Sequence, residues 1–532
     1  MSRKSEIPAT KAMTETGGMS RRAFMERALA AGLTVAAATA LFERTAQAAP
    51  KKGGVLRIGM ADGATNDNWN PAVTNTRYMI HMNHVNRSML TEIRSDNTLG
   101  PDLAESWEAS PDAKTWTFQL QQGVEFHDGK SFGAVDVVDT LNYHRNPDTG
   151  SAVASLLSSI TDVKADGKHR VVITLSSGNA DLPYVMTDYH LCILPSDGKG
   201  GVVINKNGTG SYQVVDHNPG IRTELKRNPN YWKENAAYFD GVEFTAISDA
   251  NARQTALITA DVDVIDEVDL KTVSLLKRQK SIIIDQADSN SYASLPMRMN
   301  IAPFDNHDVQ MALKYAMNRQ EWIDKIRFGY AALGNDHPVG PSMPYYASDI
   351  EQRQYDPDKA RHHLKKAGYD KLTVDFHASD APFSGGIDAA ALYKEAAQRA
   401  GININIVRHP NDGYWTDVWN KQPFCLAQWG ARPTPDMILS LVYATGVSWN
   451  ESNFSNEHFD KILVEARAEL DQTKRAELYR EMQIIIRDQC GVVVPFFKRY
   501  AYGRRKNVIH GEGLTGTWPL DGYKAAERWW FA

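Results

Sequence analysis

The chain has 532 residues, of which 42% are hydrophobic and 23% charged, and its formal net charge at pH 7 is −5. An acidic chain argues against nucleic acid as a partner, because phosphate binding requires a basic surface. The length exceeds what a single hydrophobic core usually supports, so two or three domains are expected.

The amino-terminal segment has the pattern of an export signal. Ser-Arg-Arg-Ala-Phe at residues 20–24 precedes an uncharged run at residues 28–42. That run is shorter than the roughly 20 apolar residues of a membrane-spanning helix, so it predicts export without anchoring. The paired arginines resemble the twin-arginine signature, which implies export in the folded state. The alternative is an ordinary secretory signal with a chance arginine pair.

Small residues at positions 46 and 48 form the pattern that signal peptidases accept, and cleavage is expected after Ala48 or Ala49. No cysteine near this point offers itself for lipid attachment. The product is therefore expected to be free in the periplasm of a Gram-negative cell. Removal of residues 1–49 takes away seven Lys or Arg and four Glu, which leaves a net charge of about −8.

Cysteines and apolar runs exclude two further classes of protein. The three cysteines, Cys192, Cys425 and Cys490, are too far apart in the sequence for a zinc knuckle or a redox pair. At most one disulfide could form, so disulfides are not expected to support the fold. Beyond the export signal no apolar run reaches membrane length. If the protein serves transport, another chain must supply the pore.

The first half of the mature chain is predicted to be rich in strands. Residues 53–60 form a short apolar run, and residues 115–120 alternate between apolar and polar side chains as half-buried strands do. Residues 170–175 repeat that pattern. Residues 210–229 place two strands around Asn-Pro-Gly at positions 218–220, which predicts a hairpin.

After about residue 297 helical patterns dominate. They occur at residues 307–326, at residues 356–368, where Asp356 precedes Pro357 as a helix cap, and from about His458 to Gln489. Residues 372–430 alternate strand, helix, strand, helix, strand, which predicts a parallel sheet covered by helices. Two unlike α/β bodies in one chain suggest a cleft between lobes, where ligands preferentially bind.

Common catalytic motifs are missing from the sequence. No P-loop, nucleophile elbow, zinc-protease motif or dinucleotide fingerprint occurs, so neither a catalytic residue nor a cofactor is predicted. His81 and His84 are three residues apart and could share a helix face, but no third ligand is near in the sequence, and no metal site is predicted. They are expected to be polar residues near a cleft wall. An exported hydrolase and a metal-chelate binder, the latter with His409 as a further candidate, remain alternatives.

Several long strings of the mature chain carry a resemblance. They lie, in this order, at residues 101–132, 208–232, 249–265, 299–323 and 476–497. Together they resemble the large solute-binding proteins of ABC importers that take dipeptides, oligopeptides or nickel chelates, the extracellular solute-binding protein family 5. The resemblance implies a two-lobed α/β periplasmic-binding-protein fold of the large type II class, with the ligand cleft between the lobes.

The resemblance also implies how the chain is divided. The expected parts are a signal peptide at 1–49, lobe I at 50–92, 205–297 and 495–532, an extra subdomain of lobe I at 93–204, and lobe II at 298–494. The implied function is that of the periplasmic substrate-binding component of an ABC transporter, not an enzyme. It would capture a small-molecule or peptide ligand as a monomer and deliver it to an inner-membrane permease with its ATPase subunits.

The informative departure from the family lies at residues 427–436, "AQWGARPTPD". In peptide-binding relatives the tryptophan at this place is followed three residues later by an aspartate that pairs with the ligand's free amino terminus. Here Trp429 is followed by Arg432. The inverted charge predicts a solute that is anionic or blocked at its amino group. Trp429, Arg432 and Asp436 are the candidate ligand contacts of this segment. The alternative is that Arg432 pairs with Asp436 on the same loop and never touches ligand.

Two further segments hold candidate ligand contacts by resemblance. Trp449 and Asn450 follow the segment that lines the cleft in relatives, and a tryptophan there could offer a flat face to a ring or a peptide plane. The polar loop after the first strand faces ligand in relatives, and its candidates are Asp62, Asn68 and Tyr78. The alternative for these three is that they are solvated turn residues.

Overall fold

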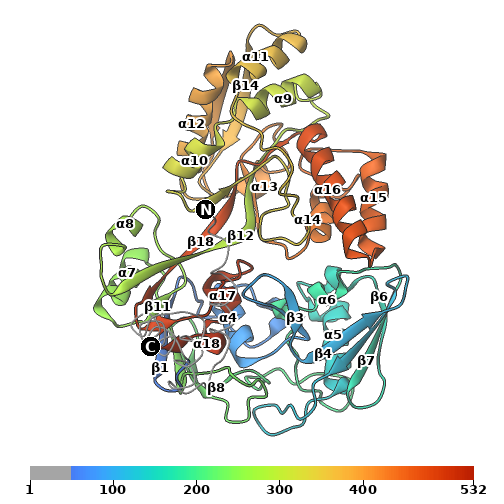
Figure 1. Cartoon of the computed structure of the whole chain (residues 1–532), viewed down its shortest axis with the longest axis vertical. Coiled ribbons are helices and arrows are strands. Elements are labelled where there is room, and N and C mark those ends of the chain that lie inside the picture. The colour runs from blue at the N-terminus through green and yellow to red at the C-terminus, as the bar shows by residue number, and fades with distance from the viewer. Residues whose placement is uncertain (1–49) are drawn as a thin grey trace, which may run out of the picture.

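The computed structural model describes residues 50–532, and the predicted export signal, with its arginine pair and cleavage point, lies outside the described residues. Figure 1 shows two bodies, here called lobe I (lower) and lobe II (upper), joined by two long strands. These are β12 (Ile282–Pro296) and β18 (Phe496–Arg505), which pair antiparallel along most of their length. The expectation of a two-lobed α/β fold is confirmed.

A ten-stranded sheet runs through lobe I and continues into lobe II along these two strands. Its order is β16-β12-β18-β11-β1-β10-β9-β8, with β13 on β18 and β17 on β12. The strands at its centre, β1, β10 and β11, pair in parallel. The bounds are β1 Val55–Met60, β8 Tyr212–Asn218, β9 Arg222–Arg227, β10 Gly241–Ala246, β11 Val264–Ile265, β13 Ala331–Leu333, β16 Ala427–Trp429 and β17 Val492–Val493.

Lobe I holds a second, four-stranded sheet in the order β4-β5-β7-β6, covered by α5 (Ala134–Arg145). The alternation predicted for β5 places Trp116, Phe118 and Leu120 in its core, where they are buried, while the residues between them are partly exposed. The bounds are β4 Ala104–Ala109, β5 Thr115–Leu120, β6 Ile160–Ala165 and β7 Arg170–Leu175.

The strands predicted for the first half of the chain are confirmed. The hairpin of β8 and β9 turns at Asn218, Pro219 and Gly220, and Gly220 has φ +72°, a left-handed conformation that favours glycine. The remaining elements of lobe I are β2 Thr91–Ile93, β3 Leu99–Pro101, β19 Val508–Ile509, β20 Trp530–Phe531, α4 Arg77–Asn86, α6 Leu182–Val185, α7 Ala250–Thr259, α8 Val273–Leu276, α17 Pro519–Tyr523, α18 Ala525–Arg528, and the short 3-10 helices η1 Pro71–Val73, η2 Pro147–Thr149, η3 Ala154–Leu157 and η4 Tyr189–Leu191.

Lobe II is built around the parallel pair β14 (Leu372–Ala378) and β15 (Ile402–Arg408) and the end of the large sheet. The third strand of the predicted parallel sheet departs from expectation. Leu426 still donates its N–H to the carbonyl of His377 in parallel fashion (2.9 Å), but β16 then pairs antiparallel with β12. The chain therefore passes from the edge of β14 to the edge of β12 at this point.

The helical stretches are confirmed but divided. The stretch 307–326 splits where Asn318 caps a new helix by accepting from the N–H of Glu321, and 458–489 splits at Asp471 in the same manner. Asp356 accepts from two backbone N–H groups, as predicted for a cap. The helices of lobe II are α9 His307–Tyr315, α10 Arg319–Lys325, α11 Pro357–Lys366, α12 Gly386–Gln398, α13 Tyr414–Asp417, α14 Pro435–Val442, α15 Glu457–Ala468 and α16 Gln472–Gln489.

The carboxyl-terminal segment completes lobe I through a buried network of charges. The ammonium of Lys233 lies 2.9 Å from carboxylate oxygens of Glu92 and Asp102 and 3.1 Å from Glu527. Arg528 adds a further contact to Glu92 at 3.4 Å. Breaking a buried pair of this kind is costly because it leaves an uncompensated charge, so these last residues are part of the lobe's core.

The lobes also touch on the side opposite α7 and α8, where α15 and α16 stand above α6 and β6 (Figure 1). Arg475 of α16 pairs with Asp181 beside α6 at 2.7 Å, and each side chain is only 1% exposed. The N–H of Ala180 donates to the carbonyl of Arg467 at 2.7 Å. We call this set the flank contact. It holds the lobes together at a second place besides the two connecting strands.

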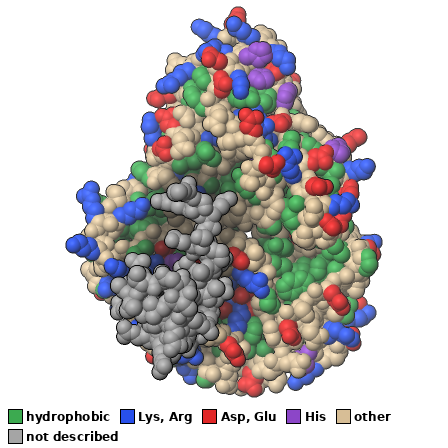
Figure 2. All heavy atoms as spheres, in the orientation of Figure 1, with side chains coloured by type: hydrophobic (Ala, Val, Ile, Leu, Met, Phe, Trp, Pro, Cys, Tyr) green, Lys and Arg blue, Asp and Glu red, His purple; other side chains and the backbone are tan. Residues whose placement is uncertain are grey.

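The absence of a disulfide scaffold is confirmed, since Cys192, Cys425 and Cys490 are all buried free thiols. Within residues 50–532 no helix combines the length and the apolar character that a membrane crossing needs. Figure 2 shows that the surface is hollowed where the two lobes meet.

Candidate ligand-binding cleft

A buried carboxylate fixes the tryptophan at the end of β16. Glu451 is 2% exposed; its Oε1 accepts from the indole N–H of Trp429 (3.0 Å) and from the hydroxyl of Ser294 (2.9 Å), and its Oε2 accepts from the indole N–H of Trp419 (2.7 Å). Burial raises the pKa of Glu451, although these three donors oppose that shift. Both indoles therefore have a set orientation.

Two more tryptophans extend this cluster to the surface. The ring of Trp449 lies 5.8 Å from that of Trp429 and 6.2 Å from that of Trp419, and Trp415 lies 6.0 Å from Trp419. Trp415 and Trp449 are 42% and 43% exposed. The cluster thus presents two aromatic faces to solvent on a rigid base, which suits contact with an apolar or planar group.

Arg432 lies just beyond Trp429, on the side of lobe II that faces lobe I. Its Nη1 donates to the carbonyls of Ala431 (3.1 Å) and Gly430 (3.4 Å), and within residues 50–532 no carboxylate oxygen lies within 4.0 Å of it. Burial lowers the pKa of Arg432, against the opposing influence of groups that include Asp188 and Tyr189 of lobe I. A partly enclosed guanidinium with only weak local acceptors is suited to an incoming anion.

The alternative that Arg432 pairs with Asp436 is wrong. Asp436 stands in the first turn of α14, is 7% exposed, and accepts from Nε of Arg467 at 3.1 and 3.2 Å and from the hydroxyl of Ser440 at 3.2 Å. Its carboxylate is occupied inside lobe II. The structure therefore gives Asp436 a structural place and does not bring it to a ligand.

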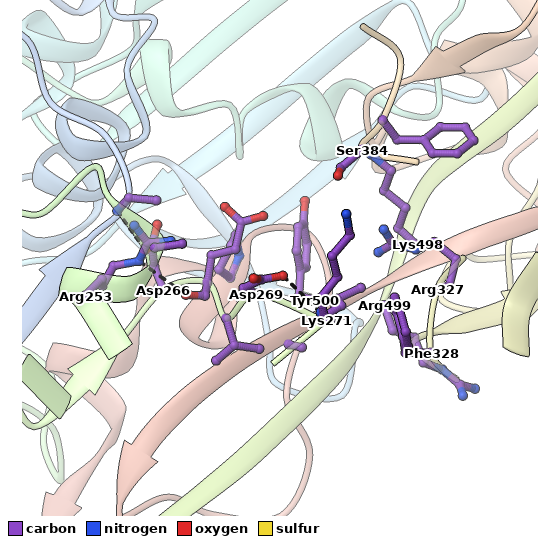
Figure 3. Close-up of a pocket in the computed structure, with 18 of the residues that line it drawn as sticks. Arg253, Asp266, Asp269, Lys271, Arg327, Phe328, Ser384, Lys498, Arg499 and Tyr500 are labelled. Atoms are coloured by element: carbon purple, nitrogen blue, oxygen red, sulfur yellow. Dashed lines mark hydrogen bonds and ion pairs between the residues drawn. The ribbon is translucent and has the colours of Figure 1, made fainter. Parts of the chain in front are cut away.

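A second part of the interlobe space lies beside β18, on the edge that pairs with β11 and β13 and not with β12. A cavity of about 470 Å³ is bounded by residues 266–271 of lobe I, by residues 326–328 and 383–384 of lobe II, and by residues 498–501 of β18. Figure 3 shows Lys271, Arg327, Ser384, Lys498 and Tyr500, which come from these different elements, around one space. The cavity is thus built jointly by both lobes and by a strand that connects them.

The model of the bacterial extracellular solute-binding proteins, family 5 (Middle), matches residues 98–450, which is more than half of the chain. The chain belongs to this family. The dipeptide-binding protein of Escherichia coli K12 is 26% identical to this family 5 chain over 430 residues, covering 74% of this chain and 80% of the relative.

Two solved structures show the same two-lobed fold as this family 5 chain. HbpA2 from Haemophilus parasuis has a TM-score of 0.80 at 20% identity, covering 90% of this chain and 100% of that one. AgaA from A. tumefaciens R10, in complex with agropinic acid, has a TM-score of 0.70 at 21% identity, covering 90% and 99%. At this identity the likeness establishes the fold.

In this family 5 chain the loop after β1 is tied to α4. The carboxylate of Asp62 accepts from the backbone N–H groups of Arg77 and Tyr78, both at 3.0 Å. Tyr78 has no exposed surface, and its hydroxyl lies 2.8 Å from Oγ1 of Thr223, so the expectation that it faces ligand does not hold. Asn68 is exposed and its side-chain oxygen accepts from a backbone N–H two residues on, which is turn chemistry.

Asn450 is also a structural residue. It is 7% exposed; its side-chain N–H₂ donates to the carbonyls of Phe454 (2.7 Å) and Ala444 (3.1 Å), and its oxygen accepts from the N–H of Phe454 (3.0 Å). These bonds hold the turn that carries Trp449. The structure thus separates the predicted pair: Trp449 is exposed next to Trp429, whereas Asn450 supports the turn from within.

The histidines of the metal alternative lie apart. His81 and His84 are buried, not on a cleft wall; the ring of His81 stacks on Tyr523 at 4.5 Å, and burial lowers the pKa of His84 to about 3. Nε2 of His409 lies 2.9 Å from Nδ1 of His377 in lobe II. In the part of the chain that the structure describes, no group of three or more His, Cys, Asp or Glu side chains is placed to hold a metal ion.

Sequence reasoning missed two features of the cleft. Glu451 directly follows the predicted pair at 449–450, but nothing in the local pattern says that an exposed-looking acid would be the buried acceptor of two indoles. The cations Lys271, Arg327 and Lys498, which line the cavity beside β18, carry no local signal either, because three distant segments bring them together.

Proposed function

We propose that this protein is the periplasmic substrate-binding component of an ABC importer, which captures a small, anionic or amino-blocked solute, peptide-like or otherwise. The observation that carries the proposal is Arg432: a partly buried guanidinium beside Trp429, at the interface of the lobes, with no carboxylate partner among the described residues. The bound molecules named for relatives, a dipeptide and agropinic acid, support a carboxylate-bearing solute.

The geometry suggests how a solute would be held. Arg432 can give two parallel hydrogen bonds to a carboxylate or phosphate, which are worth roughly 1.5 to 3 kcal/mol when one group is charged. The exposed faces of Trp415 and Trp449 can pack on an apolar or planar part of the solute. Specificity would then come from the charge at one end and from aromatic contact at the other.

Capture would proceed by closure of the two lobes about β12 and β18. A solute that touches both lobes makes more contacts when they are shut and so favours that state. For a nearly complete switch the solute must prefer the closed state by about 5.5 kcal/mol. An inner-membrane permease with its ATPase subunits would recognise the closed form of the monomer.

We retain the division of the chain as part of this proposal. Lobe I comprises 50–92, 205–297 and 495–532 with an extra subdomain at 93–204, and lobe II comprises 298–494. The separate four-stranded sheet and its own buried core support the subdomain.

Freshly purified mature protein is expected to carry its solute, and native mass spectrometry should detect a bound mass. After the solute is removed by mild unfolding and refolding, adding it back should reduce the radius of gyration measured by small-angle X-ray scattering. Steady conversion of the bound molecule into product, or an unchanged scattering profile on its addition, would count against a binding protein that works by closure.

Export is proposed to use the twin-arginine route. The double variant Arg21→Lys, Arg22→Lys is expected to stay in the cytoplasm as the precursor, because the paired arginines are the recognised feature. Cell fractionation and amino-terminal sequencing provide the measurement. The exported and cleaved parent chain is expected to begin at residue 49 or 50. Arg27→Lys is the matched control. Normal export of the double variant would favour the ordinary secretory alternative.

A further inference from the structure

Three cations line the cavity beside β18 without a carboxylate to neutralise them. Lys271 comes from lobe I, Arg327 follows α10 in lobe II, and Lys498 belongs to β18. Within residues 50–532 none of them has a carboxylate oxygen within 4.0 Å. By contrast Arg77, which also lines the cavity, pairs with Glu267 at 2.8 Å. Figure 3 shows the three cations around one space, together with Ser384.

Two of these cations are poorly hydrated. Nε of Arg327 is buried and has no hydrogen-bond partner among the described residues, and the guanidinium lies 5.7 Å from the ring centre of Phe496. In the described part of the chain, the ammonium of Lys498 contacts a neutral acceptor alone, the side-chain oxygen of Gln428. A charge that is removed from water without a counter-ion is costly, so such groups are best accounted for by an anion that arrives with the ligand.

The acids of the same cavity are already engaged. Asp266 is 1% exposed and accepts from the N–H of Ala61 at 2.8 Å; Nε of Arg253 lies 3.9 Å away. Asp269 accepts from the N–H of Lys271 within its own turn at 3.0 Å. Glu267 is paired to Arg77, and none of these three acids has a carboxylate oxygen within 4.0 Å of Lys271, Arg327 or Lys498.

We propose that this cavity, which we call the cationic hollow, binds a second anionic group of the solute, a carboxylate or a phosphate. The inference rests on the proposed function, in which Arg432 takes the first anionic group. The solute is then a molecule with two separated acidic groups. Because Lys271 belongs to lobe I and Arg327 to lobe II, an anion in the hollow also joins the lobes and favours closure.

The two anion sites are close enough for one small solute. The ammonium of Lys498 touches the side chain of Gln428, and Arg432 is four residues further along the chain. Four residues of extended backbone separate the Cα atoms of Gln428 and Arg432 by at most about 14 Å, and flexible side chains carry the two charges from there. An extended solute of peptide size with two acidic groups has the length that this arrangement requires.

The test uses the mature protein with sulfate and succinate as probes for the two anion types. Millimolar concentrations of at least one of them are expected to raise the melting temperature of the parent. Lys498→Gln or Arg327→Gln should weaken this binding about tenfold or more, and the double variant should abolish it. Lys164→Gln, which removes an ammonium that is 74% exposed on the four-stranded sheet, is the matched control and should respond like the parent.

The dependence of sulfate binding on pH provides a second readout. Burial, aided by Arg327 and Arg77 and opposed by Glu267, lowers the pKa of Lys498 to about 7, and burial raises the pKa of Asp266 to about 7. Below that pH Lys498 is charged and Asp266 is neutral. Sulfate, whose charge is constant in this range, should therefore bind more tightly one unit below pH 7 than one unit above it, and Lys498→Gln should remove most of the difference.

The test distinguishes binding of a probe in the cationic hollow from binding at Arg432. Because Arg432 can itself bind either probe, the same substitutions are also made on Arg432→Gln, where Lys498→Gln or Arg327→Gln should still weaken probe binding about tenfold or more. If sulfate alone stabilises the parent protein, the second anionic group of the solute is a phosphate. If succinate alone does so, that group is a carboxylate. Either result supports the proposal. The proposal is overturned if neither probe stabilises the parent, or if the double variant responds as the Lys164→Gln control does.

Discussion

Replacing Arg432 by alanine is expected to weaken binding of the copurified solute by roughly 10- to 150-fold. The reason is the loss of a charge-assisted, two-pronged contact worth about 1.5 to 3 kcal/mol, at 1.4 kcal/mol per tenfold. The dissociation constant from calorimetric titration of solute-free protein is the measurement. Arg432→Lys keeps the charge but not the planar fork, and it should recover only part of the affinity.

The opposite charge tests the same site more sharply. Arg432→Asp places an acid three residues after Trp429, which is the arrangement that the resemblance implies for peptide-binding relatives. It should abolish binding of an anionic solute while allowing peptides with a free amino terminus to bind. Arg408→Ala, an exposed arginine at the end of β15 in the same lobe, is the control and should bind as the parent does. Parental affinity in Arg432→Ala would contradict a role for this guanidinium in binding.

Replacing Arg475 by methionine is expected to open the lobes. In the arrangement of the lobes described here, the substitution leaves Asp181 buried and unpaired, which costs about 3 to 5 kcal/mol. The protein can avoid most of that cost by separating the lobes so that water reaches Asp181. The expected results are a larger radius of gyration and an affinity at least tenfold lower, since closure is what binding selects.

A second substitution should reverse much of this effect. Adding Asp181→Leu to Arg475→Met removes both charges, and the apolar pair can remain buried, so the double variant should lie closer to the parent than the single one. Arg480→Met, on the same helix, is the control. It removes an ion pair with Asp349 in which the side chains of Arg480 and Asp349 are 46% and 62% exposed, so the variant should behave as the parent does. If Arg475→Met keeps the parent's dimensions and affinity, the flank contact does not govern closure.

Features of the fold that depend on neighbouring residues could be predicted from the sequence. Alternation gave β5 and β7 with their observed bounds, and the Asn-Pro-Gly turn predicted the hairpin of β8 and β9. Asp356 before Pro357 predicted a helix start. Each of these follows from side-chain period or turn geometry, which a short stretch of sequence carries in full.

Features that depend on distant segments could not be predicted. Spacing alone allowed Arg432 to pair with Asp436, but Arg467, 31 residues further on, takes that carboxylate. The resemblance places the loop of Tyr78 against ligand, yet its ring is buried against Phe244 and its hydroxyl against Thr223. The resemblance pointed to Trp429 and Arg432, whereas Glu451 and the cationic hollow emerge only when the chain is folded.

The charge network at the end of the chain has a consequence for biosynthesis. Glu92, Asp102 and Lys233 are translated early, but their partners Glu527 and Arg528 follow much later in the chain. Lobe I therefore cannot reach its finished form until residues 527 and 528 have been synthesised. A translocase that inspects its cargo for completed folding would take up this chain only after that point, with lobe II already made.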